Sequence, residues 1–252
     1  MQNRYVGDIG DYGKFGLLRI LSEQQLRIGV QWYHVPDEGH NKDGKHINYL
    51  TADRFRNCDP YLFDTLKKLV QKRQRNLAAI ESSKIFGPEA TFFSEELSFN
   101  GMAAIGKAAR EARLNKRAEW NEKALQILGP ADVVFFDPDN GLEIPSKLKN
   151  HKTGPKHVFW DEIRPFHERG QSVVIYHHLG RTGGSHEEQI ATRLKEAKKY
   201  LQNGKDAFAL RFSRGTSRSY IMVPNSKHVG AYQNLISTIV DGSWNKHFSV
   251  VH

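Results

Sequence analysis

A polar turn at the end of an apolar segment is the strongest chemical signal in this chain. Residues 133–136 are all apolar, which is typical of a fully buried strand, and Asp137-Pro138-Asp139-Asn140 follows them directly. In open α/β sheets, ligands bind at the edge formed by the carboxyl ends of the strands. The alternative is an ordinary Asp- and Asn-rich turn with Asn140-Gly141 at its tip. We take Asp137, Pro138, Asp139 and Asn140 as candidate catalytic residues.

The N-terminal segment is a second candidate, because it combines glycines with aspartates. We expect residues 1–12 to form a loop and residues 14–24 to form a helix. Glycines let a backbone approach a ligand closely, and the start of a helix exposes amides to an anion. No strand precedes these glycines, so neither the dinucleotide-binding nor the phosphate-loop fingerprint applies. The candidate cofactor-binding residues here are Asp8, Gly10, Asp11 and Lys14.

Two other predicted strands also end in polar residues. The loop after the strand at 27–35 adds Tyr33, Asp37 and Glu38 to the cofactor-binding candidates. The apolar run 172–176 is followed by two histidines, residue types that serve as general bases or metal ligands. Arginines suit phosphate or carboxylate because their forked donors match those oxygens. The candidate substrate-binding residues are Arg19, Trp160, Tyr176, His177, His178, Arg181 and Arg214.

The elements that would position these residues alternate between strand and helix along most of the chain. The last part, at 206–212 and 217–223, has the pattern of a β-hairpin. Such an order predicts an α/β sandwich with a mostly parallel sheet and a C-terminal antiparallel hairpin. We expect a single domain over residues 1–252, with a helical insertion around residues 59–128.

The composition of the chain indicates what kind of partner it binds and in which cellular compartment it is expected. The 252 residues are 38% hydrophobic, which is enough for a core, and carry a formal charge of +9, which favours a nucleic-acid partner. The single cysteine excludes an intrachain disulfide and fits a cytoplasmic protein. No signal peptide or membrane span is expected. A cationic run on a predicted helix is a candidate track for a nucleic-acid backbone, or else a solvated face: Lys107, Arg110, Arg113, Lys116 and Arg117.

The chain resembles the 23S ribosomal RNA methyltransferases that modify the exocyclic amine of adenine. Those proteins open with an Arg-aromatic pair and a glycine turn into a helix, and Arg4-Tyr5 and the segment from Gly13 to Arg19 occupy the same place here. Their Asp-Pro-Pro-Tyr motif at a strand end corresponds in position to Asp137-Pro138-Asp139-Asn140. The resemblance implies a Rossmann-like α/β sandwich of the methyltransferase type. It also implies S-adenosylmethionine as the cofactor and a nucleic-acid base as the methyl acceptor.

Three departures from that family bear on the reaction. Asp139 replaces the second proline of the motif, and Asn140 replaces the tyrosine that stacks on the base. Trp160 or Tyr176 would then have to supply the stacking ring. The loop at 36–39 also lacks the glycine-rich signature for the cofactor.

Two hydrolytic hypotheses compete with methyl transfer. The strand with Asp137 and Asp139 is similar to the nucleophile motif of haloacid-dehalogenase-type phosphatases, in which the first Asp attacks phosphorus. The matching late motif of that family would be residues 6–11, so the fold would have to be permuted. A metal-dependent nuclease or phosphohydrolase is the stronger alternative, with Mg²⁺ or Mn²⁺ bound by clustered carboxylates. Its candidate metal ligands are Asp37, Glu38, Asp137 and Asp139.

Overall fold

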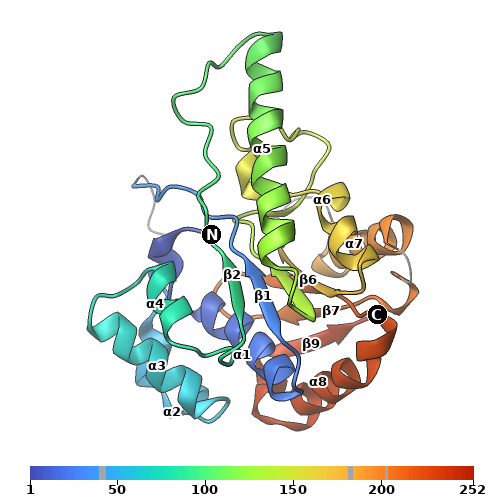
Figure 1. Cartoon of the computed structure of the whole chain (residues 1–252). Helices are drawn as coiled ribbons and strands as arrows, with labels where there is room; N and C mark the ends of the chain where they lie inside the picture. Colours follow the sequence, from blue (N-terminus) through green and yellow to red (C-terminus); the bar gives the residue numbers. More distant parts are fainter. Residues whose placement is uncertain (40–43, 181–183, 202–203) are drawn as a thin grey trace.

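The chain folds as an α/β protein with helices on both faces of a central sheet (Figure 1). The computed structural model describes residues 1–39, 44–180, 184–201 and 204–252. Within this part of the chain, seven strands form one sheet in the spatial order β2-β1-β3-β6-β8-β7-β9. They are β1 (Ile28–Gln31), β2 (Thr91–Phe93), β3 (Val133–Phe136), β6 (Ser172–His178), β7 (Phe208–Phe212), β8 (Arg218–Val223) and β9 (Phe248–Val251).

The pairing confirms a mostly parallel sheet with an antiparallel hairpin near the C-terminus. Strands β2, β1, β3 and β6 pair in parallel, whereas β8 runs antiparallel to both β6 and β7. Strand β9 pairs antiparallel to β7 at the far edge. A separate two-stranded sheet, β4 (Gly141–Leu142) and β5 (His157–Val158), follows the turn after β3. The segment between β1 and β3 holds several helices and also β2, so it contributes an edge strand to the main sheet.

Strand alternation divides the apolar side chains into one cluster on each face of the sheet. Phe135 points into the first cluster, which contains residues of α1, α3, α4 and α8. Phe136 points into the second, which contains residues of α5, α6 and α7. The helices are α1 (Ile9–Glu23), α2 (Asp53–Arg56), α3 (Pro60–Gln71), α4 (Leu77–Ser82), α5 (Lys107–Ile127), α6 (Trp160–Glu168), α7 (His186–Tyr200) and α8 (Val229–Asp241).

Helix α1 begins earlier than the glycine content indicates. The expected loop is helical from Ile9, because Asp8 caps the helix by accepting hydrogen bonds from the amides of Gly10 and Asp11. A methyl group on Gly13 would lie 2.9 Å from Phe212, and one on Gly16 would lie 2.5 Å from Trp244. These glycines let the helix pack closely against neighbouring side chains, which offsets their low helix propensity.

Two other expectations need correction. The first strand is shorter than residues 27–35, and the chain leaves it before Tyr33, whose φ of +46° is left-handed. The cationic run on α5 is not one solvated face, because Arg113 and Arg117 are buried. Arg117 forms an ion pair with buried Glu162 at 2.6 Å, which ties α5 to α6. None of the helices in the described segments is both long and apolar enough to span a membrane.

Candidate active site

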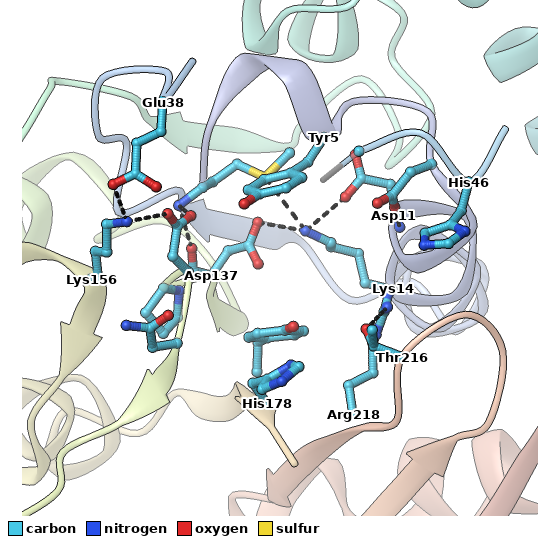
Figure 2. Close-up of a pocket in the computed structure, with 17 residues that line it drawn as sticks. Tyr5, Asp11, Lys14, Glu38, His46, Asp137, Lys156, His178, Thr216 and Arg218 are labelled. Atoms are coloured by element: carbon cyan, nitrogen blue, oxygen red, sulfur yellow. Dashed lines mark hydrogen bonds and ion pairs between the residues drawn. The ribbon is translucent and has the colours of Figure 1, made fainter. Parts of the chain in front are cut away.

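The carboxyl edge of the parallel strands opens into a cavity of about 410 Å³ (Figure 2). That volume lies within the range of small-molecule sites, roughly 300–1,000 Å³. The N-terminal half of α1 forms one wall, and the ends of β3 and β6 and the start of β8 form others. The lining residues are Met1, Tyr5, Asp8, Asp11, Lys14, Glu38, Gly44, His46, Asp137, Pro138, Asp139, Asn140, Lys156, Tyr176, His178, Thr216 and Arg218.

Lys14 lies at the centre of the cavity lining, between two carboxylates. Its ammonium nitrogen is 2.7 Å from Asp137 Oδ2 and 2.8 Å from Asp11 Oδ1. All three residues are buried, with at most 5% of each exposed. Buried charges of this kind need close partners, since leaving one unpaired costs several kcal/mol. Lys14 therefore fixes the position of Asp137 at the end of β3.

One ammonium between two carboxylates leaves the cluster with excess negative charge. The pKa of Asp11 is raised to about 7: burial is the main cause, Lys14 opposes it, and the nearby carboxylates of Asp8 and Asp137 add to it. The pKa of Lys14 is raised, because its attraction to Asp11 and Asp137 outweighs the effect of burial. We infer that Lys14 is charged at neutral pH and that Asp11 is the group in this cluster that takes up a proton.

Asp139 has its own cationic partners. The amino group of Met1 lies 2.8 Å from Asp139 Oδ1 and donates a hydrogen bond of 2.8 Å to the carbonyl oxygen of Tyr33. Lys156 lies 3.9 Å from Asp139 and 2.5 Å from Glu38. These ion pairs close the side of the cavity opposite Arg218 and Thr216 (Figure 2).

The turn after β3 is built so that its polar residues face the cavity. The amide of Asp137 still donates to the carbonyl of Gln31 on β1, at 3.0 Å, so the motif starts in register with the sheet. Gly141 has a φ of +102°, and a side chain there would lie 2.7 Å from the backbone of His177. The chain bends at residues 139–140, and Gly141 begins β4 instead of forming the tip of a turn. This bend leaves Pro138, Asp139 and Asn140 in the lining.

Strand alternation decides which residues of β6 reach the cavity. Tyr176 and His178 line it, whereas His177 points to the other face and contacts the amide of Leu142 and the guanidinium of Arg193. The pKa of His177 is lowered to about 3, mainly by burial and in part by the nearby Arg193. His177 is thus a neutral side chain packed in the interior.

Several other predicted site residues also lie outside the cavity lining. The Tyr33 ring packs against Trp120, and only its carbonyl reaches Met1. Asp37 accepts from the amide of Arg4, and Arg19 pairs with Asp59. Trp160 stacks on Tyr200 at a smaller pocket, and Arg214 donates hydrogen bonds to His247 and to the carbonyl of Lys246. Gly10 packs against Arg218. Arg181 lies outside the described residues.

The structure adds lining residues that the sequence did not single out. Lys156 comes from the stretch before β5, and Thr216 and Arg218 come from the β7–β8 hairpin. In the sequence, Arg218 lies four residues after the candidate Arg214, at the start of the second strand of the hairpin. Its register opposite His178 on β6 places it at the same sheet edge. The pairing of Arg218 with His178 follows from the tertiary structure, so no local sequence pattern indicates it.

A metal centre has no preformed ligand cluster in the described part of the chain. No group of three or more His, Cys, Asp or Glu side chains there is arranged to hold an ion. Of the four candidate ligands, Asp37 lies outside the cavity lining. The others have cationic partners: Lys14 for Asp137, and Lys156 for both Glu38 and Asp139.

Comparison with solved structures finds chains of similar fold. No family model matches the chain, and no curated protein matches it. The fold is similar to a crystal structure of a Legionella pneumophila protein described by the family model DUF519, with a TM-score of 0.45 and 12% sequence identity. The alignment covers 98% of this chain and 96% of that one.

Proposed function

We propose that the protein is an S-adenosylmethionine-dependent methyltransferase acting on a nucleic-acid base. The observation that carries the proposal is the placement of Asp137, Pro138 and Tyr176 together at one cavity, at the carboxyl edge of the sheet. The order of the final elements, with an antiparallel hairpin at the end of the sheet, agrees with the resemblance. The positive charge of the chain favours a polyanionic acceptor.

The cavity lining fits the charge of the cofactor. Five carboxylate side chains line it, against three lysine or arginine side chains and the Met1 ammonium. When a ligand displaces that ammonium, the lining favours a cationic group in its place. Acceptors at the ends of β1 and β3 already accommodate the primary ammonium of Met1, at Asp139 and the Tyr33 carbonyl. S-adenosylmethionine carries a sulfonium and such an ammonium, and it would supply an electrophilic methyl group. A ligand that uses these acceptors must displace Met1.

The residues of this chain would act mainly by positioning. The Asp137 carboxylate and the Pro138 carbonyl would accept hydrogen bonds from the target amine, and Lys14 holds Asp137 in place. Of the two aromatic residues considered for stacking on the base, Tyr176 lines the cavity and Trp160 does not. Methyl transfer needs chiefly alignment of donor and acceptor, so this set requires no strong base.

Metal-dependent hydrolysis remains the second candidate because the lining is rich in carboxylates. A metal ion would have to compete with Lys14 for Asp137 and with Lys156 for Glu38 and Asp139. Methyl transfer requires only that the Met1 ammonium leave Asp139, and the Lys14–Asp137 and Lys156–Glu38 pairs stay intact. This is why the geometry favours it.

Calorimetric titration separates the two candidates. We expect saturable binding of S-adenosylmethionine to the wild-type protein, unchanged by Mg²⁺ or Mn²⁺ and weakened about tenfold or more in Asp139→Ala, which removes the acceptor of the ligand's ammonium. The matched control is Asp132→Ala, because Asp132 pairs with Arg27 outside the cavity. Absence of nucleoside binding, together with Mn²⁺ binding that Asp137→Ala abolishes, would refute the transferase and support hydrolysis.

A further inference from the structure

Arg218 is a buried cation at the edge of the cavity, and its partners do not neutralise its charge. Only 6% of the residue is exposed. One nitrogen, Nη2, donates to the hydroxyl of Thr216 at 2.7 Å, and the buried Nε has no hydrogen-bond partner. Among the described residues, no carboxylate lies within ion-pair distance of Arg218. A buried charge without a counter-charge is costly, so such a group points to a ligand that supplies one.

The nearest acidic side chains are engaged elsewhere. Asp8 Oδ1 accepts from the amides of Gly10 and Asp11, at 2.7 and 2.9 Å, and so caps α1. Asp11 pairs with Lys14 at 2.8 Å. In this arrangement neither carboxylate forms an ion pair with Arg218.

Two glycines make room for the guanidinium. A methyl group on Gly10 would lie 1.4 Å from Arg218 Nη1, so the guanidinium lies directly against the first turn of α1. A methyl group on Gly215 would lie 3.8 Å from Nη2 and 4.0 Å from His46 Cδ2, so the guanidinium and the His46 ring border the same hairpin glycine. Arg218, Thr216 and His46 all line the cavity and lie on the same side of Lys14 (Figure 2).

We propose that Arg218, with Thr216 and His46 beside it, forms a subsite for an oxyanion of the ligand. The forked donors of arginine match the oxygens of a phosphate or a carboxylate. The anion is either a phosphate next to the target base or the carboxylate of the cofactor. If the anion is the carboxylate of the cofactor, this inference rests on the proposed methyl transfer. If it is a nucleotide phosphate, the inference does not depend on that proposal, because a phosphate suits methyl transfer and hydrolysis alike.

Two pairs of ligands distinguish the sources of the anion. Adenosine 5′-monophosphate and adenosine differ by the phosphate, whereas S-adenosylhomocysteine and 5′-methylthioadenosine differ by the amino-acid end. In calorimetry on the wild-type protein, we expect the charged member of one pair to bind about tenfold to a hundredfold tighter than the uncharged member. Arg218→Gln should remove that difference, and Arg218→Lys should restore part of it.

The control variant is Arg214→Gln, on the same hairpin. Arg214 bonds to His247 and to the carbonyl of Lys246 outside the cavity lining, so its replacement should leave the ratio unchanged. Thermal unfolding without ligand provides a second measurement. Arg218→Gln should be at least as stable as wild type, because it removes an uncompensated buried charge.

The result that overturns the subsite is equal binding of the charged and uncharged members by the wild-type protein, or an unchanged ratio in Arg218→Gln. A large loss of stability in Arg218→Gln would also contradict it and indicate a structural arginine. Failure of S-adenosylmethionine to bind concerns the proposed reaction, whereas the monophosphate titration tests the subsite independently of it.

Discussion

At the scale of single residues, the cavity is organised by Lys14 and the two carboxylates that share it. Lys14 contacts Asp11 and Asp137 at 2.8 and 2.7 Å inside the protein. The sequence predicted Asp137 because it follows an apolar strand, and it predicted Asp11 and Lys14 from an unusual segment. It could not predict that they meet, because contacts between distant residues follow from the packing of α1 against the sheet.

The charge of this cluster predicts a dependence of stability on pH. Asp11 has a folded-state pKa of about 7 against an ordinary value of 3.8, so the folded protein takes up a proton that the unfolded chain releases. The contribution of this group is fully present below pH 4 and is lost as the pH rises through about 7. Compared with Asp11→Asn, the wild-type protein should lose up to about 1.4 kcal/mol of unfolding free energy per pH unit in this window.

Urea denaturation at several pH values checks this prediction. The control is Asp132→Asn, because Arg27 lowers the pKa of Asp132 by hydrogen bonding, and its contribution is lost only at acidic pH. It should not alter the slope between pH 4 and pH 7. Parallel curves for wild type and Asp11→Asn would show that Asp11 is ionised throughout and would refute this account of the cluster.

At the scale of elements, α1 differs most from what its sequence indicates. Glycine favours loops, so a segment with regularly spaced glycines predicts one. In the structure, those glycines are the contact points of a buried helix, where Gly10, Gly13 and Gly16 lie against Arg218, Phe212 and Trp244. Tertiary packing outweighs the low helix propensity of glycine here. This can be recognised only once the side chains that face the glycines are known. The strands that end in polar residues were easier to predict, because an apolar run with an abrupt end is a local signal.

Substitution of Gly16 tests this packing. In Gly16→Ala, the new methyl group would lie 2.5 Å from the Trp244 ring, and this overlap should outweigh the gain in helix propensity. We expect a net loss of about 1–2 kcal/mol in unfolding free energy. The matched control is Gly230→Ala on α8, where nothing lies within 4 Å of the added group. It should be neutral or stabilising by up to about 1 kcal/mol. A Gly16→Ala protein as stable as the control would contradict the close packing.

At the scale of the whole molecule, the sheet edge assembles a site from distant parts of the chain. Lys14, Asp137, Tyr176 and Arg218 reach one cavity because α1 begins, β3 and β6 end, and β8 starts at the same edge. Alternating strands and helices predicted the mostly parallel sheet and the hairpin. They did not predict which side of each strand end faces the cavity, and His177 was misplaced for that reason. Trp160 was misplaced because it begins α6 and lies at the smaller pocket.

The most direct measurement of the central claim is transfer of a labelled methyl group from S-adenosylmethionine to pooled RNA and DNA. We predict that label enters a nucleic-acid fraction with the wild-type protein. Asp137→Ala and Tyr176→Ala should lower the rate by about a hundredfold, whereas Tyr200→Ala, outside this cavity, should retain it. Labelling that does not depend on Asp137 and Tyr176, or hydrolysis of nucleic acid with Mn²⁺ and no labelling, would contradict the account.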